Sequence, residues 1–199
     1  VFNYNTNLLL ENIDILDKVN GIIFVGGFTY SDNLGPATCW AYKIKNTPKI
    51  WTKLELFINN KSKFIIGVCN GFQLLLKLGI FGKGITLEEN NSGRFESRFS
   101  PICVYNSSTI FTKNMNNLKF GMWVAHKMGK IKVDTNESLK FKILLKYSSN
   151  ISPIPYYSNL DYPSNPNGSY KNIAGIVSLD NRIMGLMPHF ERSFLKYQI

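Results

Sequence analysis

The sequence predicts a three-layer α/β fold in which a mostly parallel central sheet carries an added antiparallel portion. Two continuous apolar runs, at residues 21–25 and 64–68, are rich in β-branched side chains and end at glycine-containing turns. Strands that are covered on both faces of a parallel sheet have this pattern. After about residue 99 the apolar runs become shorter and are separated by Asn, Ser and Lys, which is typical of antiparallel strands.

The first half of the chain has the pattern of a parallel βαβ unit. A strand is expected at residues 21–25, directly before Gly26 and Gly27. The second strand, at residues 64–68, is followed by apolar residues at helical spacing, which predicts a helix over about residues 70–77. The stretch between the two strands is long enough for a helical crossover.

The second half is expected to be antiparallel. Its strands are predicted at residues 102–105, 121–125 and 141–147, and a loop rich in Pro, Tyr, Ser and Asn covers residues 152–170. A last pair of strands, at residues 173–177 and 183–187, is joined by a turn at Asp180-Asn181. Because there is no internal repeat and no linker, residues 1–199 are expected to form a single domain.

Composition excludes several classes of protein. The 199 residues are 44% hydrophobic, but no apolar run approaches the roughly 18 residues of a membrane span. Three widely spaced cysteines predict neither a disulfide framework nor a metal site, and favour a cytoplasmic setting. The net charge of +10 comes from scattered lysines, so no nucleic acid is expected as partner. Residue 1 is Val, and we expect an N-terminally incomplete fragment of a longer chain.

The segment Gly67-Val68-Cys69-Asn70-Gly71 carries the strongest chemical signal. A strand, a G-x-C-x-G turn and a helix in succession form the pattern of a nucleophile elbow, with a thiol as nucleophile. At the helix N-terminus, unpaired N–H groups favour a thiolate, and the N–H of Asn70 could bind an oxyanion. The alternative, that Cys69 is only a small buried hydrophobic residue, stays open on this pattern alone.

A thiol nucleophile requires a base, and the chain has only His126 and His189. His189 is preferred because Glu191 lies two residues later and can orient the imidazole. Gly26, Gly27 and Phe28 end the other buried strand and are expected to form the second wall of the site, although a simple tight turn would also explain two glycines.

Several segments, in order along almost the whole chain, resemble the class I (triad) glutamine amidotransferases, and among them the glutaminase domain of phosphoribosylformylglycinamidine synthase. The G-x-C-x-G element is shared by many amidotransferases, whereas the Arg-Phe-Glu-Ser-Arg-Phe and Asn-Pro-Asn-Gly-Ser segments resemble this purine enzyme in particular. The matching segments are residues 26–35, 67–73, 91–99, 162–169, 173–176 and 187–192.

The resemblance implies a flavodoxin-like glutaminase fold and the hydrolysis of glutamine through a γ-glutamyl thioester on Cys69, with His189 as general acid and base and Glu191 orienting it. It implies that ammonia passes to a synthase domain of the same longer chain, which uses ATP and Mg²⁺ to convert formylglycinamide ribonucleotide to its amidine. No cofactor and no metal are expected in this domain itself. Oxyanion and substrate binding is assigned to nine matched positions: Gly26, Gly27, Phe28, Asn70, Gln73, Asn91, Ser92, Arg94 and Phe95.

The chain departs from the family pattern at three places. The family usually has His-Gly-Glu-Gly where this chain has residues 126–129, His-Lys-Met-Gly, and the proline usual between the triad His and Glu is Phe190 here. Residues 36–39, Pro-Ala-Thr-Cys, replace a stretch that is richer in glycine and acidic residues in the family. Two alternatives therefore accompany the glutaminase interpretation. One is a catalytically impaired, amidotransferase-like interaction module, and the other is a cysteine hydrolase of the DJ-1/PfpI type.

Overall fold

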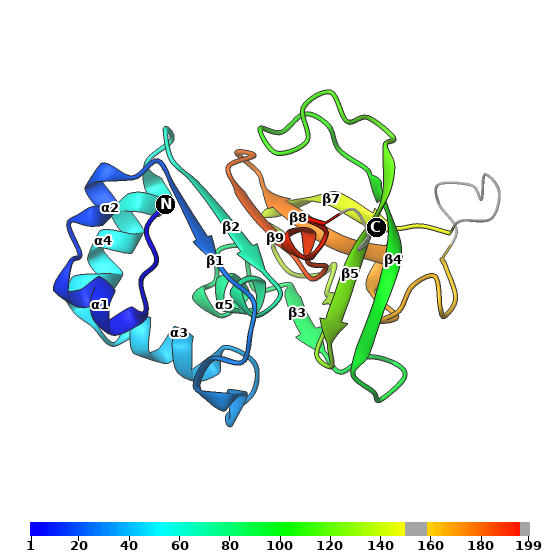
Figure 1. The fold of residues 1–199 in the computed structure, drawn as a ribbon, viewed down its shortest axis with the longest axis horizontal. Helices are drawn as coiled ribbons and strands as arrows, with labels where there is room; N and C mark the ends of the chain where they lie inside the picture. Colours follow the sequence, from blue (N-terminus) through cyan, green and yellow to red (C-terminus); the bar gives the residue numbers. More distant parts are fainter. Residues whose placement is uncertain (150–158, 196–199) are drawn as a thin grey trace.

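A computed structural model describes residues 1–149 and 159–195, and these residues form an α/β structure around a seven-stranded sheet (Figure 1). The strand order is β1-β2-β9-β8-β7-β4-β5, and β3 and β6 form a separate two-stranded sheet. The strands are β1 (Gly21–Phe24), β2 (Phe64–Val68), β3 (Ile85–Glu88), β4 (Glu96–Val104), β5 (Lys119–His126), β6 (Lys130–Val133), β7 (Phe141–Tyr147), β8 (Ile173–Ser178) and β9 (Ile183–Leu186).

The sheet is mixed. β1 pairs in parallel with β2, and β2 pairs in parallel with β9, whereas the four pairings β9–β8, β8–β7, β7–β4 and β4–β5 are antiparallel. The expected α/β class with an added antiparallel portion is thus confirmed. The sheet was predicted to be mostly parallel, but only the pairings β1–β2 and β2–β9 are parallel, because the antiparallel strands continue the same sheet. The sequence predicted β9 only as the hairpin partner of β8; in the structure it also joins the two halves of the sheet by pairing with β2.

Five α-helices surround the parallel part: α1 (Thr6–Glu11), α2 (Ile15–Lys18), α3 (Thr38–Lys45), α4 (Pro48–Asn59) and α5 (Asn70–Leu78). Figure 1 shows α1 to α4 gathered at the β1 end of the sheet. Pro48 occupies the first turn of α4, where its missing N–H costs nothing. Gly79, at φ 84°, ends α5 in the left-handed conformation that glycine adopts without strain.

The helix α5 packs on β1, β2 and β9 and carries the centre of the core. Phe72, Leu74 and Leu75 are completely buried. An ideal Cβ on Gly185 of β9 would overlap the ring of Phe72, so this glycine leaves the space that the ring fills. This packing fixes the position of α5 on the sheet, and it also fixes the turn between β2 and α5.

The antiparallel part is more extended than the sequence predicted. β4 begins at Glu96, six residues before the expected start, because its polar first half pairs with β5 from Glu96 opposite His126 onwards. Two short turns of 3-10 helix, at Tyr170–Asn172 and Phe190–Arg192, lie on either side of the β8–β9 hairpin. Part of the loop expected at residues 152–170 lies outside the described residues.

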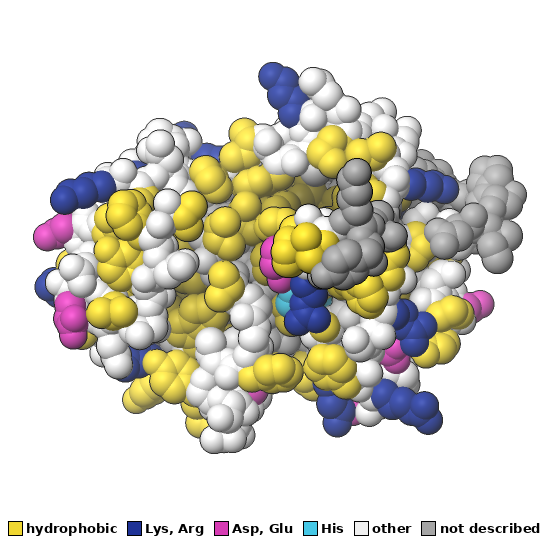
Figure 2. All heavy atoms as spheres, viewed as in Figure 1, with side chains coloured by type: hydrophobic (Ala, Val, Ile, Leu, Met, Phe, Trp, Pro, Cys, Tyr) yellow, Lys and Arg dark blue, Asp and Glu magenta, His cyan; other side chains and the backbone are white. Residues whose placement is uncertain are grey.

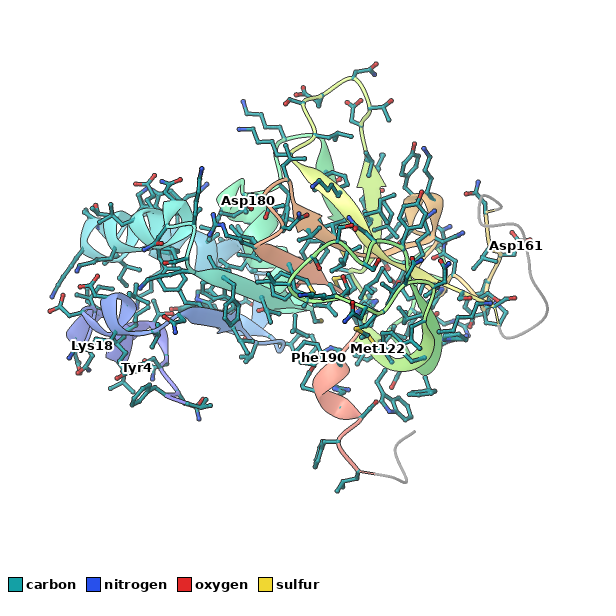
Figure 3. All side chains as sticks on the ribbon, turned by 90° about the horizontal axis from the view of Figure 1, so that it is seen from above. Tyr4, Lys18, Met122, Asp161, Asp180 and Phe190 are labelled. Carbon is teal, nitrogen blue, oxygen red and sulfur yellow. The ribbon has the colours of Figure 1, made fainter. Side chains whose placement is uncertain are left out.

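The C-terminal turn folds back onto β5. In Figure 3, Phe190 lies beside Met122 of β5, and Asp161 lies at the end of the molecule opposite Lys18. The backbone N–H of His189 donates to the carbonyl of Trp123 at 2.7 Å, which extends the pairing of β5 by one bridge. His189 is thereby brought to the carboxyl end of β2, next to Cys69. Among the residues that the structure describes, no helix is long and apolar enough to span a bilayer.

Candidate active site

Cys69 occupies the sharp turn between β2 and α5, as the G-x-C-x-G pattern predicted. Its backbone lies at φ 50° and ψ −105°, a conformation that a residue with a Cβ rarely adopts. The flanking glycines make room for this turn. A Cβ on Gly67 would lie 2.7 Å from the carbonyl oxygen of Gly71, and a Cβ on Gly71 would overlap the carbonyl of Phe24. The elbow therefore requires glycine at both positions.

The Cys69 thiol is buried, with 6% of the residue exposed. Its Sγ lies 3.9 Å from the carbonyl oxygen of Ala125 on β5. Burial raises the pKa of Cys69 to about 12, and the hydrogen bond from the backbone N–H of Asn70 only partly opposes this effect. The helix N-terminus was expected to lower the pKa of the thiol and favour the thiolate, but in this structure burial raises that pKa by more. The thiol is thus neutral at pH 7 and needs a base to ionise.

The imidazole of His189 is oriented by Glu191. Nδ1 of His189 lies 2.5 Å from Oε1 of Glu191, and the imidazole is buried. Partial burial by itself would raise the pKa of Glu191, but the hydrogen bond from His189 lowers it below the ordinary value, so the carboxylate is ionised. The other ring nitrogen, Nε2, is buried and has no hydrogen-bond partner among residues 1–149 and 159–195. His189 therefore has one nitrogen fixed by a carboxylate and one available to accept a proton.

Gly26 is the point where the cysteine and the histidine meet. A Cβ built on Gly26 would lie 2.8 Å from Cε1 of His189 and 3.4 Å from Cβ of Cys69. The two side chains are therefore neighbours, although no hydrogen bond joins them in the described residues: the thiol is directed at the carbonyl of Ala125. Proton transfer from sulfur to imidazole therefore requires the thiol to turn from this carbonyl toward Nε2 of His189.

The edge strand β5 holds both groups. The carbonyl of Trp123 accepts from the N–H of His189, and the carbonyl of Ala125, two residues further on, accepts from the Cys69 thiol. Carbonyl groups two residues apart on a strand point in the same direction. One strand therefore sets the distance between the sulfur and the imidazole.

His126, the other histidine, is part of a buried polar cluster. Its Nε2 lies 2.6 Å from Nδ2 of Asn167, which also donates to Oδ1 of Asn90 at 2.7 Å. The hydroxyl of Tyr147 donates to Oδ1 of Asn167 at 2.6 Å. Burial lowers the pKa of His126 to about 4, so this imidazole is neutral at pH 7. His126 is therefore paired with an amide, whereas His189 is the histidine paired with a carboxylate.

The side chains of Asn70 and Gln73 are buried and bonded to one another. Nδ2 of Asn70 donates to Oε1 of Gln73 at 2.9 Å, and Nε2 of Gln73 donates to the carbonyl of Met128 at 2.9 Å. The same Nδ2 also donates to the carboxylate of Asp32, and Oδ1 of Asn70 accepts from the hydroxyl of Thr29. The backbone N–H of Asn70 still lies next to the sulfur, as expected for an oxyanion donor. The side-chain amides of Asn70 and Gln73 make their hydrogen bonds to other residues of this chain.

The remaining predicted binding residues divide between two places. Phe28 and Phe95 are exposed, and their rings lie 6.5 Å apart, so the loop after β1 contacts the segment before β4. The other three, Asn91, Ser92 and Arg94, line a pocket of about 420 Å³ together with residues from the 160–168 loop. No triad residue lines this pocket.

Figure 2 shows hydrophobic side chains over the middle of one face, between the helical end and the antiparallel end of the molecule. A small part of a histidine side chain is visible there, between an acidic and a basic side chain. The exposed apolar residues of the described chain include Ile23, Val25, Phe28, Phe95, Phe190 and Phe194. The region around the end of β1 is thus partly apolar and accessible.

Sequence reasoning missed four side chains that support the site. Thr29, Asp32 and Asn167 lie in segments that were matched to the family, and Asn90 directly precedes another. The sequence pointed to these residues only through their position in or beside the matched segments. Hydrogen bonds between residues that are far apart in the chain produce no periodic pattern in the sequence. Within residues 1–149 and 159–195 there is also no group of three or more His, Cys, Asp or Glu that could hold a metal ion.

The comparisons with known proteins agree with this geometry. The family model of the CobB/CobQ-like glutamine amidotransferase domain matches residues 3–199. A PurQ subunit of phosphoribosylformylglycinamidine synthase from Methanococcus maripaludis is 40% identical over 86% of this chain and 65% of its own length. A probable phosphoribosylformylglycinamidine synthase from Caenorhabditis elegans is 36% identical over 92% of this chain and 15% of its own length.

Among solved structures, PurLQS from Thermotoga maritima matches with a TM-score of 0.72 and 30% identity, covering 92% of this chain and 74% of that one. The chain spans less than two thirds of the length of the archaeal subunit and a small part of the nematode enzyme. These matches favour the glutamine amidotransferase interpretation over a DJ-1/PfpI-type hydrolase. The chain belongs to the family of CobB/CobQ-like glutamine amidotransferase domains.

Proposed function

We propose that this chain hydrolyses glutamine to glutamate and ammonia through a thioester on Cys69. The observation that carries the proposal is the meeting of a cysteine elbow and a carboxylate-oriented imidazole around Gly26. A buried, neutral thiol beside a histidine with a free ring nitrogen is suited to proton transfer from sulfur to nitrogen at the moment of attack.

The reaction begins when Nε2 of His189 takes the Cys69 proton and the sulfur attacks the carboxamide carbon of glutamine. The tetrahedral intermediate collapses as the C–N bond breaks, and His189 returns the proton to the leaving nitrogen, which departs as ammonia. A water molecule then gives a proton to His189 and attacks the thioester, which releases glutamate and restores the thiol. Throughout these steps Glu191 holds Nδ1 and stabilises the protonated ring.

The negative oxygen of the intermediate needs donors beside the sulfur. The backbone N–H of Asn70 lies next to Cys69 at the start of α5, where the helix dipole also favours negative charge. The N–H groups of the Gly26–Phe28 turn are the second candidate, because this turn lies against both catalytic side chains. Removing one such donor typically costs about 10²- to 10³-fold in kcat.

The acceptor of the ammonia is the active site of phosphoribosylformylglycinamidine synthase. This assignment rests on the names of the relatives and on the match to a structure titled PurLQS. ATP and Mg²⁺ belong to the synthase partner, which lies in the same longer chain or on a separate subunit, and no cofactor is assigned to this domain. A cytoplasmic setting with glutamine as the small-molecule substrate completes the proposal.

Cys69→Ser in the assembled synthase tests the mechanism. We expect glutamine-dependent synthesis to fall below detection and ammonia-dependent synthesis to stay within about twofold of wild type, because a serine hydroxyl here is far harder to ionise. Both rates are measured as amidine formation with ATP present. A Cys69→Ser enzyme that still uses glutamine would rule out the thioester. Normal ammonia use without any glutamine use by the wild type would instead indicate an impaired, docking-only module.

A further inference from the structure

The turn that follows the Gly26–Phe28 segment has a strained backbone. Tyr30, Ser31 and Asp32 lie at φ 53°, 55° and 49°, so three consecutive residues with a Cβ adopt the left-handed conformation. In that conformation the Cβ is crowded by the following carbonyl, and only isolated residues usually visit it. Such a turn persists only where the surrounding structure holds it.

One buried amide holds both ends of this turn. Asn70 is completely buried, and its Oδ1 accepts from the hydroxyl of Thr29 at 2.7 Å and from the N–H of Thr29 at 3.3 Å. Its Nδ2 donates to the carboxylate of Asp32 at 3.2 and 3.3 Å. The first residue of α5 is therefore bonded to the residue before the strained turn and to the last residue within it.

The contact extends in two directions from Asn70. Asp32 also accepts from the N–H of Ala37 at 3.1 Å, and Ala37 is a further residue with positive φ, at 55°. Asn70 also donates to Gln73, which donates to the carbonyl of Met128 in the loop between β5 and β6. A continuous chain of hydrogen bonds thus joins the 29–37 loop to the 127–129 loop through the first turn of α5.

These hydrogen bonds connect the 29–37 loop to the residues around Cys69. Asn70 directly follows Cys69, and Thr29 directly follows the Gly26–Phe28 segment, in which Gly26 lies against the His189 ring and Cβ of Cys69. If the strained turn is released, Thr29 loses its bonds to Asn70, and the segment that Thr29 follows is no longer tied to the residue next to Cys69. The loop and the nucleophile are thus positioned by the same side chain.

We propose that Asn70 is a positioning residue that latches the strained 29–32 turn, and that the loop has a latched state, competent for catalysis, and a released state. Gln73 supports the latch by accepting from the same Nδ2 of Asn70 that donates to Asp32, which fixes the orientation of the amide. The two side chains act through the loop and the helix. The catalytic part of this inference rests on the proposed glutaminase function, whereas the latch itself is a property of the fold.

Hydrogen exchange measured by mass spectrometry on peptides covering residues 28–37 tests the latch in the full-length protein with its synthase partner. The first variant is Thr29→Val, which removes the hydroxyl bond to Asn70 and keeps the side-chain volume, in a position that is only half-buried. We expect exchange in these peptides to rise about 3- to 10-fold, as for the loss of one hydrogen bond. Unchanged exchange overturns the proposal.

Relief of the strain provides the discriminating test. Ser31→Gly added to Thr29→Val removes the crowded Cβ at a left-handed position, so we expect exchange, corrected for intrinsic rates, to return toward the wild-type value. Ser31→Ala is the matched control, because it removes the same hydroxyl and keeps the Cβ, and it should give no rescue. Equal rescue by alanine, or none by glycine, overturns the proposal.

The glutamine-dependent rate of the same variants reports on the catalytic consequence. We expect kcat with glutamine to fall in Thr29→Val and to recover in the glycine double variant, while ammonia-dependent synthesis is unchanged. Exchange decides whether the latch exists. If exchange behaves as expected and the glutamine-dependent rate does not follow it, the latch stands and the assignment of the oxyanion donors to residues 26–28 is wrong.

Discussion

Gly26→Ala should separate the two catalytic side chains without disturbing the rest of the fold. The backbone of Gly26 does not lie in the left-handed region, so alanine fits its conformation, and the whole effect comes from the added methyl group. That methyl group would lie 2.8 Å from Cε1 of His189. To regain ordinary van der Waals contact the imidazole must move by roughly half an ångström or more.

This displacement of the imidazole sets the size of the expected loss in kcat/KM for glutamine. A misplacement of about 1 Å at a reacting group can cost about 10²-fold in rate, so the variant should lose about 10- to 100-fold in kcat/KM for glutamine. This loss corresponds to about 1.4 to 2.7 kcal/mol of transition-state stabilisation. Ammonia-dependent synthesis, measured on the same preparation, should be unchanged because added ammonia bypasses the cysteine and histidine altogether.

Gly27→Ala is the matched control. Its Cβ would meet no atom within 4 Å, but its φ of 137° is one that alanine rarely adopts. Backbone strain alone should therefore lower the melting temperature of Gly27→Ala, whereas Gly26→Ala should melt near wild type and lose glutamine use. Wild-type kcat/KM for glutamine in Gly26→Ala would refute the placement of His189 against Gly26.

Three further outcomes are expected in denaturation experiments. Gly71→Ala should lower the free energy of unfolding in urea by about 3 kcal/mol or more, because its Cβ overlaps the carbonyl of Phe24; a stable variant would contradict the elbow packing. Tyr147→Phe should cost about 1 to 3 kcal/mol by leaving Oδ1 of Asn167 without its buried donor, and a neutral effect would argue against the polar cluster. The pKa of His126 is lowered from 6.5 to about 4, so its stabilising contribution is complete above pH 6.5 and is lost as the pH falls toward 4. Wild type should therefore lose about 3 kcal/mol more than His126→Gln between pH 7 and pH 4 in urea titrations, and parallel curves would disprove the buried neutral imidazole.

The elbow was predictable because every requirement for it is local. The apolar run of β2, the glycines at 67 and 71 and the helical spacing of α5 lie within fifteen residues, and the predicted helix over 70–77 agrees with the observed Asn70–Leu78. The pairing of His189 with Glu191 was predictable for the same reason, since the two residues are separated by one position. In the structure His189 has an extended backbone and Glu191 lies in the 3-10 turn Phe190–Arg192 that follows it.

Only the tertiary structure decided how these pieces meet and what surrounds them. The parallel pairing of β9 with β2 joins segments more than a hundred residues apart, and it brings His189 to Cys69. The burial of the thiol, which raises its pKa where the helix terminus alone would lower it, depends on β5 crossing over the elbow. The sequence determined which residues carry the chemistry, because turns, periodicity and short spacings are properties of neighbouring residues. The protonation of the thiol and the latch at Asn70 depend on desolvation and on hydrogen bonds between distant segments, which exist only once the chain is packed.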